Sequence, residues 1–233
     1  TDTELDKIGH AYNEMLKNIE EFQNEVKNQQ KELRISEMNT LISQINPHFL
    51  YNTLDTIYML ARINGEEKTM KMIQALSKYL RLSLSKGREI VTVEDELENV
   101  KSYMEIQQIR NENLFRYEIE CAEELKTRWI LKLILQPIVE NAVKHGLRPK
   151  KGNGTVRIEA HRQEGHLEVT VMDDGAGMGE ETLKNLNDSL GQEEMGVLTT
   201  DGWEHVGIKN AYDRIRKNFG PEYGLEIMST EGT

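Results

Sequence analysis

The sequence predicts an α+β fold, with a helical N-terminal part followed by a part in which helices pack on a sheet. Up to about residue 110, apolar residues recur at spacings of three and four, which is typical of amphipathic helices. Beyond that point, short alternating segments separated by turn residues indicate strands, mixed with further helical periodicity. No internal repeat is apparent.

Composition narrows the class of protein. The 233 residues suffice for one or two domains with substantial cores, and 37% of them are hydrophobic. The net charge of −11 argues against a nucleic-acid-binding surface. The single cysteine, Cys121, excludes an internal disulfide and suits a reducing compartment. No run approaches the roughly 18 apolar residues that a membrane helix needs.

Residues 1–33 carry a narrow heptad seam with polar residues between its positions. Because a stripe this narrow cannot bury itself, we expect a parallel homodimer; the alternative is an amphipathic helix packed on another domain. The seam positions are Leu5, Ile8, Tyr12, Met15, Ile19, Phe22, Val26, Gln29 and Leu33.

Residues 34–90 predict a helical hairpin. The apolar face widens after Leu33, Asn64-Gly65 marks a turn, and a second periodic helix runs from Glu67 to about Ser85. Two such hairpins from two chains would form a four-helix bundle.

Within the first of these helices, Pro47 deletes a backbone N–H and marks either a bend or a helix boundary. His48 follows it, and Asn52 lies four residues further on, which places both side chains on one helical face. On its own, the Pro47-His48 pair indicates a helix boundary with one core histidine.

Residues 91–233 predict an α/β sandwich with a mostly antiparallel sheet. Thr92 offers an N-cap with Asp95 as its capping partner, and a helix follows to about Arg110. We expect strands at 115–120, 155–161, 166–172 and 225–228, and helices at 129–144, 180–187 and 206–218.

Two motifs in this part suggest chemistry. Asp173-Asp174-Gly175-Ala176-Gly177 follows a strand, and its glycines permit close approach of a flat ligand. Glu140–Gly146 closes an apolar helix, and its Asn141 and Lys144 share a face suited to Mg²⁺ and phosphate. Alone, the first could be a plain acidic turn and the second a polar helix end before a glycine cap.

Taken together, the motifs resemble a known family. Glu140–Gly146 resembles the N-box, and Asp173-x-Gly175-x-Gly177 the G1 box, of the GHKL (Bergerat-fold) ATPases. Gln44–Asn52 resembles the phosphoacceptor box of LytS/YesM-type sensor histidine kinases. Order and spacing agree from about residue 36 to 230.

The resemblance implies ATP and Mg²⁺ as cofactors and a role for each matching residue. His48 would be the phosphoacceptor, and Asn52 would either orient water for dephosphorylating a partner or bond another helix. In the nucleotide site, Asn141 would bind Mg²⁺, Lys144 and His145 would lie near the phosphates, Asp173 would bind the adenine amine, and Gly175 and Gly177 would shape the pocket floor.

The sequence departs from the family pattern at the end of the expected ATP lid, which would run from Gly179 to Glu204. The family usually has Gly-x-Gly there, whereas this chain keeps only Gly207 after Glu204-His205-Val206. Phosphate contacts at the following helix start would therefore be weaker.

The first residues, Thr3–Met15, resemble the second helix of a HAMP module. Such modules follow transmembrane helices in bacterial receptors. The resemblance implies a membrane span upstream and the cytoplasmic side of the cell membrane as the location of this chain.

The sequence thus predicts a dimeric sensor histidine kinase that phosphorylates His48 from Mg-ATP and passes the phosphoryl group to an aspartate of a response regulator. One alternative is a non-catalytic signalling module with a weak nucleotide pocket. Another is a GHKL ATPase or serine kinase that uses no histidine, against which the His48 box argues.

Overall fold

The computed structural model describes residues 47–84, 89–111, 115–147, 154–191 and 206–231, together with Glu14, Met15, Lys17, Ile19, Phe22 and Val26. The chain divides into two compact units, Thr1–Asn52 and Thr53–Thr233. In the residues described, no helix has both the length and the apolar character that crossing a membrane requires.

Four positions of the predicted heptad seam fall among the described residues, and all four are helical. Met15, Ile19, Phe22 and Val26 follow one another at the expected spacings, and 51%, 45%, 67% and 37% of their surfaces are exposed. In a single chain these apolar side chains therefore lie on the surface. The remaining seam positions are outside the described residues.

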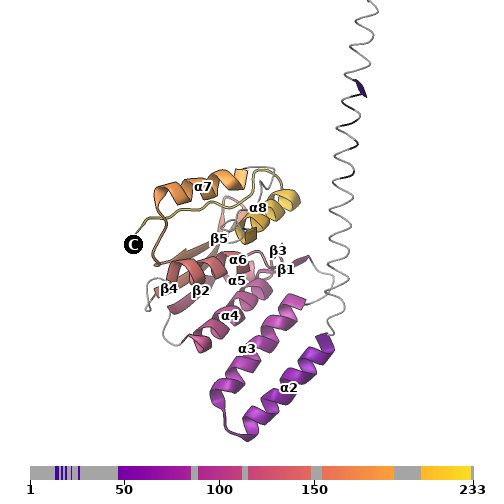
Figure 1. Cartoon of the computed structure of the whole chain (residues 1–233), viewed down its shortest axis with the longest axis vertical. Coiled ribbons are helices and arrows are strands. Elements are labelled where there is room, and N and C mark those ends of the chain that lie inside the picture. Colours follow the sequence, from indigo (N-terminus) through magenta and orange to yellow (C-terminus); the bar gives the residue numbers. More distant parts are fainter. Residues whose placement is uncertain are drawn as a thin grey trace, which may run out of the picture. The chain divides into compact units, whose positions relative to one another are not determined.

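The predicted helical hairpin is confirmed by α2 (Pro47–Ile63) and α3 (Glu67–Leu84), shown in Figure 1. Between them, Gly65 has a φ of 70°, which glycine adopts without the steric cost of a Cβ atom. The Asn64 N–H donates to the Leu60 carbonyl at 3.1 Å and closes the turn. The predicted bend before Pro47 involves residues that are not described.

The capping prediction at Thr92 is also confirmed. Thr92 Oγ1 accepts a hydrogen bond from the Asp95 N–H at 3.1 Å and starts α4 (Val93–Arg110). Helix α3 runs beside α4 (Figure 1), and Asn99 Nδ2 donates to Ser83 Oγ at 3.2 Å between them.

The main sheet has three strands: β2 (Phe115–Cys121), β4 (Gly154–Gln163) and β5 (His166–Asp173). β2 pairs with β4 in parallel, while β4 pairs with β5 as the predicted antiparallel hairpin. Gly165, with a φ of 90°, lies in the hairpin turn. Alternate β4 side chains point into the core, where Val156 and Ile158 are fully buried. The short helix α5 (Glu123–Lys126) follows β2.

The single helix predicted for residues 129–144 is wrong. Trp129–Leu131 is strand β3, which pairs antiparallel with β1 (Ile90–Thr92), and a turn then leads to α6 (Gln136–Asn141). Pro137 lies in the first turn of α6, where its missing N–H costs nothing. The helix then widens into a π-helix, η1 (Ala142–Leu147).

The C-terminal region contains α7 (Glu180–Gly191) and α8 (Val206–Phe219), which pack against each other. The first half of the expected lid is therefore α7, and residues 192–205 are not described. The strand predicted at residues 225–228 is also wrong, because this segment makes no strand pairing. It is held instead by contacts such as that of Asn187 Nδ2 with the Ile227 carbonyl at 3.4 Å.

A buried carboxylate fixes the turn between β3 and α6. Glu96 on α4 is 1% exposed, and its two oxygens accept the N–H groups of Leu133 and Leu135 at 2.8 and 2.9 Å. Leu133 has a φ of 57°, a conformation that costs energy in a non-glycine residue, so the carboxylate holds the turn in place. Burial raises the pKa of Glu96 above its ordinary value, although both N–H groups and Arg214 oppose the rise.

We expect Glu96→Ala to lower the free energy of unfolding by about 2–5 kcal/mol, because two buried N–H groups would lose their acceptor. The raised pKa means that folding favours the protonated carboxyl, so stability falls as pH rises from the unfolded value through the folded one. The difference in free energy of unfolding between the parent and Glu96→Ala, measured by urea unfolding, should therefore become smaller as pH rises over that interval. A constant difference would contradict the assigned titration.

Candidate functional site

Two predicted motifs that are far apart in the sequence meet backbone to backbone. The Ala176 N–H donates to the Gly146 carbonyl at 2.9 Å. A Cβ atom on Gly146 would lie 2.2 Å from Asp173 Oδ1, and one on Gly175 would lie 2.4 Å from the Gly146 carbonyl. Glycine is therefore required at position 175, where backbone is in the way, while a side chain at position 146 would displace the Asp173 carboxylate.

The structure distinguishes the two adjacent aspartates of the second motif. Asp174 Oδ1 accepts the Thr155 N–H at 2.7 Å and ties the turn to strand β4. Asp173 Oδ1 accepts the Gly175 N–H at 3.0 Å, while the residue stays exposed. Asp173 therefore presents an oriented carboxylate to solvent, where it can accept a hydrogen bond from a ligand amine.

Gly177 lies at the base of the same turn. Its φ is +68°, and a Cβ atom at this position would lie 2.0 Å from the Thr230 carbonyl. For both reasons, only glycine fits at position 177. The Met178 N–H also donates to Ser229 Oγ at 2.8 Å. The C-terminal segment thus packs against the turn, although it does not form the predicted strand.

The end of the other motif is π-helical, a conformation found most often at functional sites. Asn141, at the end of α6, is half-buried, whereas Lys144 and His145 in η1 are exposed. Lys144 Nζ forms an ion pair with Glu140 Oε2 at 3.0 Å. An amide oxygen and an ammonium group of this kind suit Mg²⁺ and phosphate respectively.

Sequence reasoning missed the residues that hold Lys144. Glu140 Oε1 accepts a hydrogen bond from Gln136 Nε2 at 2.8 Å, and the same amide contacts the hydroxyl of Tyr79. The spacing of four between Gln136, Glu140 and Lys144 was the available signal, since residues at this spacing share a helical face.

His48 and Asn52 lie in the first unit, and their predicted proximity is confirmed. Asn52 Nδ2 is 3.2 Å from His48 Nδ1, and both residues are exposed on α2. Which atom donates depends on the imidazole tautomer and on the orientation of the Asn52 amide. Either arrangement fixes one ring nitrogen and leaves Nε2 outside this contact.

Gly207 lies in the first turn of α8, next to α6. A Cβ atom at this position would lie 3.0 Å from Pro137 Cβ, so a small residue allows the two helices to approach closely. The residues directly before α8 are not described.

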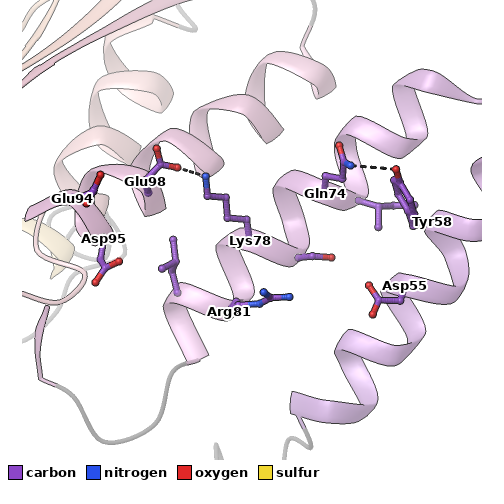
Figure 2. Close-up of a pocket in the computed structure, with 11 residues that line it drawn as sticks. Asp55, Tyr58, Gln74, Lys78, Arg81, Glu94, Asp95 and Glu98 are labelled. Atoms are coloured by element: carbon purple, nitrogen blue, oxygen red, sulfur yellow. Dashed lines mark hydrogen bonds and ion pairs between the residues drawn. The ribbon is translucent and has the colours of Figure 1, made fainter. Parts of the chain in front are cut away.

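A groove that the sequence analysis did not predict lies between α2, α3 and the start of α4. Its volume is about 630 Å³, and its lining is largely charged. Figure 2 shows Lys78 of α3 reaching Glu98 of α4, and Gln74 donating to the Tyr58 hydroxyl at 3.3 Å. The groove therefore lies where polar contacts hold α3 to both neighbouring helices.

Comparison with protein families identifies the kind of protein. A family described as histidine kinase matches residues 36–115, and one described as histidine kinase-, DNA gyrase B-, and HSP90-like ATPase matches residues 128–232. The chain belongs to the histidine kinase family. Membership implies a part in two-component signalling, and the second match implies ATP binding and confirms the predicted fold class.

Individual relatives agree with this assignment. The chain is 34% identical to sensor histidine kinase YesM of Bacillus subtilis (strain 168) over 229 residues, which cover 98% of this chain and 37% of YesM. It is 30% identical to sensor protein kinase HptS of Staphylococcus aureus (strain USA300) over 227 residues, covering 97% of this chain and 42% of HptS. The chain thus spans less than half the length of either relative.

A solved structure was also compared. The histidine kinase domain from the Erythrobacter litoralis EL346 blue-light activated histidine kinase aligns with a TM-score of 0.39 and 15% sequence identity. The alignment covers 72% of this chain and 84% of that one.

The packing of the two motifs gives a prediction for Gly175. Gly175→Ala should weaken ATP binding about tenfold or more, because its Cβ atom would force the Gly146 backbone away at a cost of roughly 1–3 kcal/mol. Titration calorimetry would measure the affinity. Gly165→Ala in the β4–β5 turn is the control, since it strains a φ of 90° but would place its Cβ within 4 Å of no atom, so it should lower stability and leave ATP affinity unchanged. Parent-like affinity in Gly175→Ala would contradict the close packing.

Proposed function

We propose that this chain is an Mg-ATP-dependent protein-histidine kinase that phosphorylates His48 and passes the phosphoryl group to an aspartate of a response regulator. The contact of Gly146 with Asp173 and Gly175 carries the proposal, since it joins the two motifs that the nucleotide site needs. The exposed His48, held by Asn52, supplies the acceptor.

In the nucleotide site, the oriented Asp173 carboxylate would accept a hydrogen bond from the exocyclic amine of adenine, above a floor formed by Gly175 and Gly177. The residues of the other motif would face the phosphates. Asn141 would contribute an amide oxygen to Mg²⁺, whose other ligands would be water and phosphate, and Lys144, His145 and Gly207 would lie near the triphosphate.

At His48, transfer needs a ring nitrogen with an available lone pair. If the Asn52 amide is turned so that its oxygen and not Nδ2 faces Nδ1, that oxygen would accept a hydrogen bond from the Nδ1–H, and the lone pair would lie on Nε2. A bond from Nε2 to the γ-phosphorus forms as the bond to the bridging oxygen breaks, and ADP leaves. Asn52 is thus a positioning residue in autophosphorylation, and orienting water for dephosphorylation is its second proposed role.

We also propose that the working unit is a homodimer. The exposed Met15, Ile19, Phe22 and Val26 suit a coiled coil with a second copy. Apolar residues on α2 support a four-helix bundle: Phe49, Ile57, Met59, Leu60 and Ile63 are all exposed. The resemblance of Thr3–Met15 to the second helix of a HAMP module supports the further proposal that a membrane span lies upstream of the coil and that the kinase lies on the cytoplasmic side.

The deciding experiment is incubation of the dimeric protein with γ-labelled ATP and Mg²⁺. Acid-labile, base-stable label is expected, together with its transfer to a receiver domain. The second candidate function is a non-catalytic signalling module, which the incomplete glycine pattern before Gly207 favours. ATP binding without any label would support that alternative, and acid-stable label would indicate a serine kinase.

A further inference from the structure

A continuous chain of polar contacts joins the hairpin to the lysine of the nucleotide motif. It starts at Tyr79 on α3, passes through Gln136 and Glu140 on α6, and ends at Lys144 in η1. We propose that Tyr79 positions Lys144 for the nucleotide phosphates through these two intermediates, so that the placement of α3 controls nucleotide affinity. This inference rests on the proposed function of the Lys144 site.

The donor and acceptor atoms of each side chain fix the order of these contacts. The amide nitrogen of Gln136 carries two hydrogens, one for the Tyr79 hydroxyl and one for Glu140 Oε1 at 2.8 Å. Glu140 then has its other oxygen, Oε2, for Lys144 Nζ at 3.0 Å. Gln136 and Glu140 each bond one residue before and one residue after them in this series. Loss of the Tyr79 bond would therefore let Gln136 move, which loosens Glu140 and in turn Lys144.

The position of Tyr79 depends on how α3 of the hairpin packs against α4. Its ring packs against Tyr103 of α4 with 6.4 Å between ring centroids, and its hydroxyl also bonds Ser83. Ser83 in turn accepts a hydrogen bond from Asn99 of α4, which is 2% exposed. Burial raises the pKa of Tyr79, so the hydroxyl stays protonated at neutral pH.

One further contact between α3 and α4 is an ion pair. Lys78 and Glu98, which both line the groove, form this pair (Figure 2). The lysine side chain is 50% exposed. An exposed ion pair of this type contributes little and yields to water. A shift of α3 would therefore have to break the Tyr79 contacts along with the others between these helices, and loss of the Tyr79 contacts would change the position of Lys144.

A double-mutant cycle on the full chain tests the proposal, with Mg-ATP affinity measured by titration calorimetry. Tyr79→Phe keeps the ring and removes the hydroxyl, so we expect affinity to fall about three- to tenfold, the effect of one hydrogen bond. In a Lys144→Met background the same change should have no further effect. Equal losses in both backgrounds would overturn the proposal, because Tyr79 would then act on folding alone.

The control is Tyr58→Phe. The Tyr58 hydroxyl on α2 also accepts a hydrogen bond from a glutamine amide, that of Gln74 on α3, but it has no connection to α6 in this series of contacts. This substitution should leave affinity unchanged. A second measurement requires no nucleotide: acetylation of Lys144, followed by peptide mass spectrometry, should become severalfold faster in Tyr79→Phe than in the parent. An unchanged rate would overturn the inference, whereas failure of the parent to bind ATP would overturn the proposed function instead.

Discussion

Replacing His48 with glutamine is expected to abolish acid-labile phosphate on the protein, a loss of at least about a thousandfold, because the amide has no nucleophilic nitrogen. Glutamine keeps a polar side chain of similar size, so α2 and its contact with Asn52 can persist. The measurement is label from γ-labelled ATP retained after alkali and lost in acid.

His161→Gln is the control for this experiment. His161 is a half-buried histidine, 3.7 Å from Glu168 on the sheet hairpin, and it has no asparagine at a spacing of four. Its replacement should leave labelling at the parent level. Retention of label in His48→Gln would show that a different residue is the phosphoacceptor, and ATP binding by that variant would show that the nucleotide site is a separate element.

Asp173→Asn is expected to weaken ATP binding about ten- to hundredfold. The parent carboxylate is held by the Gly175 N–H and presents only acceptors, whereas an amide can turn its NH₂ group toward the adenine amine. An unmatched hydrogen bond of this kind costs about 1–3 kcal/mol. Guanine nucleotides should gain relative to ATP, since guanine presents an oxygen where adenine carries its amine.

The control variant is Asp213→Asn on α8, where an exposed carboxylate pairs with Lys209 at 3.0 Å. The Lys209 side chain is largely buried, so this change should lower stability slightly while ATP affinity stays near the parent value. Unchanged ATP affinity in Asp173→Asn, measured by calorimetry, would argue against the adenine contact even if the chain proves to be an active kinase.

Several elements were predictable because their causes are local. The hairpin follows from a helical period interrupted at Asn64-Gly65, and α4 follows from the hydroxyl of Thr92 three residues before Asp95. The contact between His48 and Asn52 follows from a spacing of four on one helix. In each case the interacting groups lie within one turn, so the sequence contains both partners.

Other features depend on partners that are distant in the chain. Trp129–Leu131 is an apolar run that fits a helix or a strand equally well, and its pairing with Ile90–Thr92 decides between them. The clamp of Glu96 on Leu133 and Leu135 is likewise invisible in the local pattern, although it determines where α6 begins.

The sequence alone determined the family, the acceptor histidine expected from the resemblance, and the residue types of the nucleotide motifs. The resemblance had already selected Asp173, but the contacts that separate it from Asp174 are decided by folding: Asp173 accepts the Gly175 N–H within the turn, whereas Asp174 accepts the Thr155 N–H of strand β4. The link from Tyr79 to Gln136 was decided in the same way, since packing of α3 on the neighbouring helices brings together side chains 57 residues apart.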